Sequence, residues 1–381
     1  MESRLLIFSG ILFSTLATQF MTNLSNSPLS QITSLLEKAY HQGIIQGAQW
    51  MALKNGIVQG AGQAGQAYEI YDLASLTKPL ATALACLILQ DQGKLDLDTP
   101  VSSYLSGLGS LEKKSITVRQ ALTHTAGFAA WRPFYLLTHH PDEIISAINQ
   151  IPLEYEAGSK VVYSDLGYIV LGKMLEKITV TPMEKLFQFL VTAPLHLKNL
   201  RYCPPKSWKS RIAPTEVGNQ YEQGLAVRTI GLDWPTAYQW RTTLIQGEVH
   251  DGNAFFFKGG AGHAGLFGSI QDVAALSHQF LPGSQLLKPS TLKEFCHNST
   301  PGQSEARSPG WILAQTPHCS AGDTCSPHAF GHVGFTGTSL WIDPESMTVT
   351  ILLANRTFPI QDLTPLRRQF HSLATTLSNK A

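Results

Sequence analysis

The chain has 381 residues, of which 43% are hydrophobic and 14% charged, and a net charge of +1. This length allows one large domain or two, and the apolar content is sufficient for a sizeable core. A charge close to zero without a long basic run argues against a nucleic-acid-binding protein.

The first 21 residues contain a short apolar segment. Leu5–Phe13 is mostly apolar, follows Arg4 and is followed by small residues. This pattern is typical of a signal peptide with a weak basic start, and the segment is short for a membrane span. We therefore expect an exported, periplasmic or cell-envelope protein in which residues 1–21 are a signal peptide or an anchor. A start at Met21 is the alternative and keeps a cytoplasmic location open.

The amino-terminal elements are a helix and a hairpin. Ser27-Pro28 suits the cap and first residue of a helix that Gly43 ends. Two β-type runs, 47–53 and 57–62, flank Asn55-Gly56, which is a strong signal for a tight turn. This part of the chain therefore contributes at least two antiparallel strands.

The middle of the chain, about 82–215, is predicted to be mostly helical, and strands return from about residue 310. The helix candidates are 141–148, 166–178 and a run that begins at a capping box, Thr181-Pro182-Met183-Glu184. The later candidates are the strands 311–313, 338–342 and 348–353 and a closing helix over 366–378, begun by Thr364-Pro365. This order indicates an α+β fold, with an antiparallel sheet flanked by terminal helices and an inserted helical region. An active site would lie in the cleft between the sheet and the insert.

Ser75 and Lys78 stand one helical turn apart at the start of the apolar run Leu80–Leu89. Pro79 fits a helix here only in or next to its first turn, which places Ser75 at the helix start. Residues three apart share a helix face, so Lys78 can reach the Ser75 oxygen. A buried lysine resists carrying charge, and its neutral amine can accept the proton of a serine that attacks a carbonyl. Alone, such a pair also occurs by chance on ordinary helices.

Tyr163 lies on a loop of the helical region, two residues before Asp165. A tyrosine and a lysine that lie close together share a proton readily, because each charge state stabilises the other. A tyrosine here could therefore assist Lys78. The alternative is a loop tyrosine followed by a helix cap at Ser164 or Asp165.

The segment Gly331–Thr338 is rich in glycine and leads into a strand. Glycines such as Gly334 let a substrate backbone approach closely. The N–H of Phe335 can pair with that of Ser75 as an oxyanion hole, and His332 can offer a polar or cationic wall to a substrate carboxylate. The alternative is a glycine-rich turn with an incidental histidine.

These segments, in this order, resemble the class C β-lactamase and penicillin-binding serine hydrolase family. The likeness rests on Asp72–Pro79, Leu122–Gly127, Tyr163–Asp165, Gly262–Phe267 and His332–Gly334. It runs from about Leu29 to the last helix. It implies a β-lactamase/transpeptidase-like fold, with residues 22–381 as the hydrolase domain and a helical subdomain over about 82–215.

The resemblance also implies roles for individual residues. Ser75 would be the acylated nucleophile, Lys78 its proton acceptor and relay, and Tyr163 a general base or acid beside Lys78. The substrate or its oxyanion would be bound by Asp165, His332, Gly334 and Phe335. This chemistry needs no metal ion and no organic cofactor.

Two positions depart from the true β-lactamases. His332 replaces the lysine of their Lys-Thr-Gly motif, and Asp165 stands where they usually have asparagine. An ionised aspartate can only accept hydrogen bonds, and it would favour a charged Lys78 if it lay close. These departures resemble the DD-carboxypeptidase and esterase branches of the family.

We therefore predict a serine-type D-Ala-D-Ala carboxypeptidase that acts through an acyl-enzyme on peptidoglycan peptides and that β-lactams can acylate. The alternatives are a carboxylesterase, a class C-like β-lactamase and a non-catalytic penicillin-binding sensor.

The remaining chemistry-bearing residues have mainly structural interpretations. His124 and His263 occur in family-like motifs and are expected to brace loops, and the segment 249–254 is more readily a structural loop than part of the cleft. Cys319 and Cys325 bracket a short loop and would form a disulfide in an exported protein or remain free thiols. Nearby histidines do not complete a recognised zinc spacing, so we expect no metal site.

Overall fold

The structure, a computed structural model, describes residues 27–231, 238–356 and 361–380. The signal peptide or anchor predicted for residues 1–21 lies outside the described residues. Among the described helices, none is both long and apolar enough to cross a membrane.

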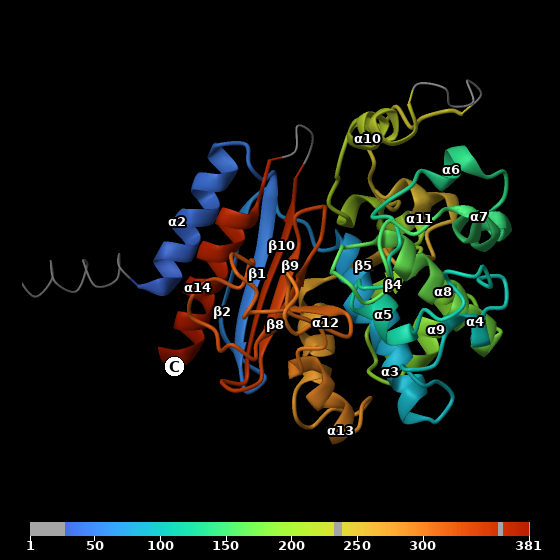
Figure 1. The fold of residues 1–381 in the computed structure, drawn as a ribbon. Helices are drawn as coiled ribbons and strands as arrows, with labels where there is room; N and C mark the ends of the chain where they lie inside the picture. Colours follow the sequence, from blue (N-terminus) through green and yellow to red (C-terminus); the bar gives the residue numbers. More distant parts are fainter. Residues whose placement is uncertain (1–26, 232–237, 357–360, 381) are drawn as a thin grey trace, which may run out of the picture.

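One side of the molecule is a seven-stranded antiparallel sheet (Figure 1). From one edge to the other its strands are β2 (Ile57–Gly65), β1 (Gly47–Lys54), β10 (Thr348–Asn355), β9 (Ser339–Asp343), β8 (Phe330–Val333), β7 (Trp311–Leu313) and β6 (Arg307–Ser308). Because β1 pairs with β10 from Gly47 opposite Asn355 to Lys54 opposite Thr348, strands from both ends of the chain meet inside the sheet. The predicted antiparallel sheet is confirmed.

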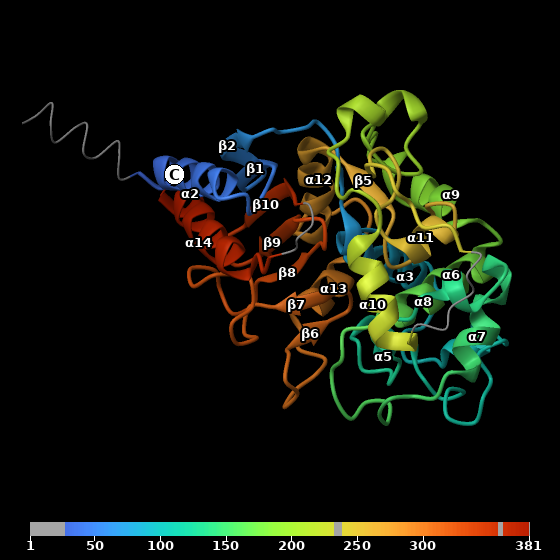
Figure 2. The ribbon, with the colours of Figure 1, turned by 90° about the horizontal axis from the view of Figure 1, so that it is seen from above.

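The outer face of this sheet is covered by α2 (Pro28–His41) and α14 (Thr364–Lys380), which lie side by side (Figures 1 and 2). Side chains alternate along β1, as a pleated strand requires. Trp50 packs beneath these helices with its ring 6.2 Å from that of Phe370. Its neighbour Met51 joins the core on the inner face. Both faces of β1 are therefore buried.

Two local signals of the amino-terminal part are confirmed. Ser27 caps α2 by accepting the N–H of Ser30 at 3.2 Å. In the turn between β1 and β2, Asn55 has φ 51° and Gly56 has φ 75°. A tight type I′ turn requires this left-handed conformation at both positions, and asparagine and glycine adopt it most readily.

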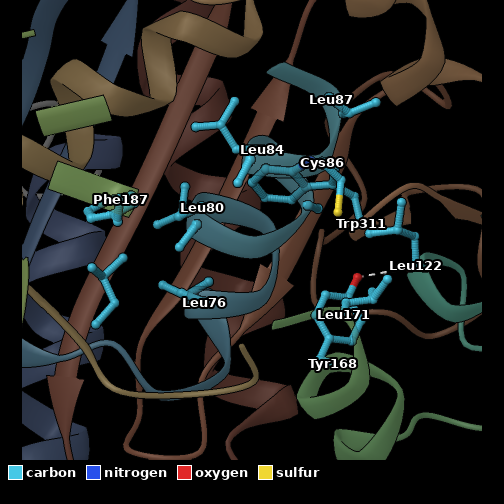
Figure 3. Packing of buried hydrophobic residues seen from close by; sticks show 14 of the residues in the cluster. Leu76, Leu80, Leu84, Cys86, Leu87, Leu122, Tyr168, Leu171, Phe187 and Trp311 are labelled. Carbon is cyan, nitrogen blue, oxygen red and sulfur yellow. Dashed lines mark hydrogen bonds between the residues drawn. The ribbon is translucent and has the colours of Figure 1, made fainter. Parts of the chain in front are cut away.

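The inner face of the sheet packs on α12 (Ile270–Ser277), and the segment around Ser75 forms the centre of the core (Figure 3). This segment consists of a 3₁₀ turn, η1 (Ala74–Leu76), a π-helical stretch, η2 (Lys78–Ala83), and α3 (Leu84–Asp91). The predicted apolar helix is thus present but irregular at its start. In a regular helix, Pro79 would lack the N–H for one hydrogen bond and its ring would collide with an earlier carbonyl. The wider π-helical turn relieves this collision. Such turns are frequent at functional sites.

The rest of the inner side is mostly helical. Its helices are α4 (Val101–Tyr104), α5 (Val118–Leu122), α6 (Phe134–Leu137), α7 (Ile144–Gln150), α8 (Asp165–Thr179), α9 (Met183–Phe187), α10 (Gln220–Ile230), α11 (Gly252–Phe256) and α13 (Pro289–Leu292). Helices therefore continue beyond residue 215, where the predicted helical region ends. Together with the sheet they confirm the α+β fold class.

A second sheet was not predicted. It consists of β3 (Tyr71–Asp72), β5 (Leu266–Gly268) and β4 (Leu200–Tyr202), and β3 leads directly into the Ser75 turn. Strands of two or three residues are too short to show a period in the sequence.

The predicted capping box at residues 181–184 is wrong. Helix α9 begins at Met183 with Pro182 as its cap residue, and the hydroxyl of Thr181 donates to the carbonyl of Thr179 at 2.9 Å. The N–H of Met183 is instead bound by the Glu176 carboxylate at 3.0 Å. The start of α9 is thus capped by Glu176 of α8 and not by a residue of its own first turn.

All five cysteines lie in the described part of the chain and are free thiols. Cys319 and Cys325 therefore form no disulfide in this structure. Within the described residues, no group of three or more His, Cys, Asp or Glu side chains is arranged to hold a metal ion.

The close approach of α8 to a neighbouring loop can be tested with two alanine substitutions on the same helix. A Cβ added at Gly172 would lie 2.9 Å from the backbone of Gly262, whereas one added at Gly167 would have its nearest neighbour at 3.6 Å. We expect Gly172→Ala to lower the free energy of unfolding by about 1–3 kcal/mol because the site is overpacked. Gly167→Ala should leave it unchanged or raise it by up to about 1 kcal/mol, through helix propensity.

Urea unfolding of the two variants and the parent protein measures both changes. An equal effect of the two substitutions would show that the contact between α8 and the Gly262 loop is not tight.

Candidate active site

Ser75 lies on a sharp turn between β3 and the π-helical stretch. The residue before it, Ala74, has φ 46°, a left-handed conformation that is costly for alanine and is typical of functional sites. The buried Asp72 carboxylate holds this turn, because it accepts the N–H of Ala74 and the N–H of His250, each at 2.8 Å. Burial raises the pKa of Asp72 to about 6. The strained turn is thereby tied to the loop before α11.

Lys78 is fully buried beneath Ser75. Its Nζ lies 2.9 Å from the Ser75 Oγ, 2.9 Å from the carbonyl oxygen of His263 and 2.8 Å from Oδ1 of Asp165. Burial alone would lower the pKa of Lys78, but the charge of Asp165 and the Tyr163 hydroxyl raise it above its ordinary value. Lys78 is therefore an ammonium ion. A charged Lys78 is what the sequence led us to expect if Asp165 lay close, and it replaces the neutral amine expected from burial alone.

Tyr163 completes this cluster. Its hydroxyl interacts with the side chains of both Ser75 and Lys78, and the Lys78 Nζ lies 5.0 Å from the centre of its ring. Burial raises the pKa of Tyr163, so the hydroxyl keeps its proton. The structure thus brings together the three residues for which a proton-transfer role was predicted.

His124 supports the tyrosine from behind. The two rings lie 4.6 Å apart, and the His124 Nδ1 accepts the N–H of Ser164 at 3.0 Å. Burial and the nearby charges of Arg307 and Lys78 hold the pKa of His124 well below its ordinary value. A neutral imidazole at this place fixes the loop that carries Tyr163, as expected for a bracing residue.

The loop between β8 and β9 is fixed against the Ser75 turn. The hydroxyl of Thr336 donates to the carbonyl of Asp72 at 2.6 Å, and that of Thr338 donates to the carbonyl of Leu73 at 3.1 Å. At Gly334 a Cβ would lie 2.6 Å from the same Leu73 oxygen, so a side chain is excluded there. The roles of the two threonines were not predicted. The only signal for them in the sequence is their alternation with glycine in Gly334–Thr338.

The predicted oxyanion hole is compatible with this arrangement. Ser75 and Phe335 line the same pocket, and in the described chain neither backbone N–H donates to another protein group. Backbone N–H groups that are fixed and unpaired can bind the oxygen of a tetrahedral intermediate.

His332 lies on β8 with its ring buried. Its Nδ1 donates to the carbonyl of Val333 at 2.9 Å, and its buried Nε2 has no partner. Burial, with the charges of Arg307 and Lys78, holds the pKa of His332 well below its ordinary value. The side chain is therefore a neutral acceptor. Of the polar or cationic wall expected from the sequence, the structure favours the polar one, because the charges of Arg307 and Lys78 lie nearby.

A pocket of about 550 Å³ opens in front of Ser75. Its lining includes three arginines that were not predicted, Arg307, Arg356 and Arg367. The guanidinium of Arg307 lies 5.8 Å from the centre of the Tyr163 ring and pairs with Glu305. Because Arg307 belongs to the two-residue strand β6, no motif or periodicity marks it in the sequence.

Carboxyl groups also line the pocket. Glu222 of α10 accepts the N–H of Gly252 at 2.7 Å and the hydroxyl of Tyr135 at 3.1 Å. Burial and the charge of Asp251 raise the pKa of Glu222 to about 8. Asp251 lies 2.8 Å from Nε2 of His263, the residue whose carbonyl contacts Lys78. The 249–254 segment therefore both supports the site and lines the pocket.

Comparisons with known proteins agree with this geometry. The family model described as "Beta-lactamase" matches residues 30–374. A protein of Escherichia coli (strain K12) named "Putative D-alanyl-D-alanine carboxypeptidase" is 32% identical over 313 residues, which cover 75% of this chain and 69% of that protein.

Solved structures share the fold. EstCE1, described as a hydrolase with promiscuous acyltransferase activity, aligns with a TM-score of 0.70 at 21% identity, over 91% of this chain and 98% of that one. A penicillin-binding protein homolog from Caulobacter crescentus aligns with a TM-score of 0.69 at 19% identity, over 92% and 97%. The family match spans most of the chain and confirms a serine hydrolase: this chain belongs to the beta-lactamase family.

Proposed function

We propose that this protein is a D-Ala-D-Ala carboxypeptidase that removes the terminal residue of small envelope peptides through an acyl-enzyme on Ser75. The observation that carries the proposal is the position of Ser75, with Lys78 and Tyr163, in a pocket whose lining includes three arginines. The name of the Escherichia coli relative supports the same substrate class.

Arg307 in the pocket lining suits a substrate that ends in a carboxylate. Arg307 is 5% exposed, and a guanidinium held in this way can bind a carboxylate through two parallel hydrogen bonds. Its present partner, Glu305, has a side chain that is 36% exposed and can move away. The terminal carboxylate of a D-Ala-D-Ala peptide would then lie beside Tyr163.

The reaction needs two acyl transfers. The Ser75 Oγ attacks the penultimate carbonyl carbon, and the N–H groups of Ser75 and Phe335 bind the oxyanion. The bond to the terminal amino acid breaks, and its amine receives a proton through Lys78 and Tyr163. Water then attacks the ester carbonyl, which releases the shortened peptide and restores Ser75.

A second candidate function is favoured by the apolar part of the pocket. Trp131, Leu225 and Ile312 contribute to its lining and would suit an apolar acyl group. A carboxylesterase is therefore the second candidate. A β-lactamase with fast deacylation and a penicillin-binding sensor without turnover would use the same serine.

We also propose that the protein acts in the cell envelope. The apolar segment Leu5–Phe13 supports this, and so does a substrate class that occurs outside the cytoplasm. Fractionation of cells that express the full chain tests the location. A periplasmic or membrane-associated protein is the expected result, and a cytoplasmic protein of full mass would contradict it.

Replacing Ser75 tests the acyl-enzyme. We expect wild-type protein incubated with a reporter β-lactam to gain one adduct, and Ser75→Ala to gain none, as measured by intact-protein mass spectrometry. Hydrolysis of a D-Ala-D-Ala peptide should fall by at least about 1,000-fold in the variant, because the nucleophile is lost. An equal rate in the two proteins would exclude Ser75 as the nucleophile.

Replacing Arg307 tests the substrate carboxylate. We expect Arg307→Gln to lower kcat/KM for a D-Ala-D-Ala peptide by about 10–100-fold, through loss of a charge-assisted pair. The same peptide with a carboxyl-terminal amide, which cannot form that pair, is the matched control and should be affected far less. Equal losses with both peptides would mean that Arg307 does not recognise the carboxylate.

A further inference from the structure

We infer that Asp165 is the terminal proton acceptor of a relay that runs from Ser75 through Lys78. This inference rests on the acyl-enzyme part of the proposed function. It gives Asp165 a role in proton transfer rather than the substrate-binding role that the resemblance implies for that position.

In the resting cluster, three groups around Ser75 already hold their protons. The Ser75 hydroxyl, the Tyr163 hydroxyl and the Lys78 ammonium are each fully protonated. Among the groups in direct contact with Lys78, Asp165 is the one whose side chain can take up a further proton. Lys78 or Tyr163 can therefore become a base within the cluster only when a proton moves to Asp165.

The geometry permits that movement. The Lys78 Nζ lies 2.9 Å from the Ser75 Oγ and 2.8 Å from the Asp165 Oδ1, so it bridges the nucleophile and the carboxylate. This carboxylate oxygen is buried and has no hydrogen-bond partner besides that ion pair. The Asp165 backbone is fixed because its N–H donates to the Ala130 carbonyl at 2.8 Å. A proton can thus pass over two short contacts without any rearrangement of the backbone.

The place of Asp165 in the fold suits an acceptor. It is the first residue of α8, a helix of 15 residues, where the helix dipole favours a negative charge. Its side chain is 17% exposed and lines the pocket. The carboxylate therefore faces Lys78 on one side and the substrate space on the other.

The proposed step is balanced. As the bond from Ser75 Oγ to the carbonyl carbon forms, the Oγ–H bond breaks and its proton passes to Lys78. Lys78 gives one of its own protons to Asp165, and the carbonyl π electrons move to the oxygen. When the intermediate collapses, the scissile bond breaks, and the proton on Asp165 returns through Lys78 to the leaving group. Asp165 is again a carboxylate and Lys78 again an ammonium.

Other titratable groups face this cluster and are the same residues in every Asp165 variant. They are Tyr163 and Tyr168 near Lys78, Asp251 and His263 beside α11, and His124, His332 and Arg307 around the tyrosine. Among the nearby carboxylates, Asp251 already pairs with His263 at 2.8 Å. It is not within the short contacts of Lys78.

The test is the pH dependence of Ser75 acylation by p-nitrophenyl acetate, measured from pH 5 to 10.5 with Ser75→Ala as the background. In the wild-type protein the cluster contains its own proton acceptor, so acylation should not require loss of a proton to solvent within this range. In Asp165→Asn the cluster carries a net positive charge and must lose a proton to solvent before any base is free. We expect the acid limb of kcat/KM to move to higher pH by at least about 2 units, since it then follows a lysine rather than a carboxylate.

Two further variants make the result specific. Asp165→Glu keeps a carboxylate and should retain the acid limb at low pH, even with a lower rate. Glu305→Gln removes another carboxylate of the same pocket, one that does not contact Lys78. It should leave the midpoint of the acid limb unchanged.

A uniform loss of rate in Asp165→Asn with an unmoved midpoint would overturn the relay, because a structural role predicts that result. An Asp165→Asn protein that is folded by circular dichroism but inactive at every pH would also overturn it, since a neutral Lys78 should restore activity in alkali. The small ester keeps this test independent of the peptide substrate. Failure to cleave a D-Ala-D-Ala peptide would reject the proposed carboxypeptidase and leave the relay standing.

Discussion

The ion pair of Lys78 and Asp165 is the interaction on which the rest of the site depends. A fully buried ammonium ion is very costly unless charged and polar partners surround it. Lys78 has three within 2.9 Å, and they come from the Ser75 turn, the start of α8 and the loop after α11. Removing one partner would leave a buried charge unsatisfied. The segments that carry these partners must therefore keep their relative positions for the protein to stay folded, and the same requirement orients the nucleophile.

The large sheet contributes the other half of the pocket. Thr336 and Thr338 donate to the carbonyl groups of Asp72 and Leu73, the two residues before the Ser75 turn, so the loop between β8 and β9 is held against it by direct hydrogen bonds. The arginines come from β6, from the end of β10 and from α14, and they supply positive charge where His332 remains neutral. The two parts of the molecule therefore contribute different groups to the pocket. The helical part and the Ser75 segment carry the Ser75, Lys78 and Tyr163 cluster, and the sheet side contributes Phe335 and the arginines.

Much of this could be predicted from the sequence, because its strongest signals are local. The Ser27 cap, the Asn55-Gly56 turn and the spacing of Ser75 and Lys78 act over a few residues, and each is present as expected. The features that were missed depend on distant partners. The charge of Lys78 is set by Asp165, which is 87 positions away (165 − 78). Arg307 lies on a strand too short to recognise, and the cap of α9 comes from Glu176 on another helix. The neutral state of His332 likewise follows from burial beside Arg307, which no local pattern reveals.

The pairing of β1 with β10 has a consequence for the time at which activity can appear. Gly47 lies opposite Asn355, so the chain must place residues separated by 308 positions (355 − 47) side by side before the sheet is complete. Contacts of such long sequence separation form slowly and late. Arg307, His332 and Phe335 all belong to the last quarter of the chain, so an unfinished chain has the serine and lysine but neither the oxyanion partner nor the arginines. A partly synthesised or truncated chain is therefore expected to be inactive as a hydrolase. The pocket around Ser75 is complete only when the last quarter of the chain has been made and folded.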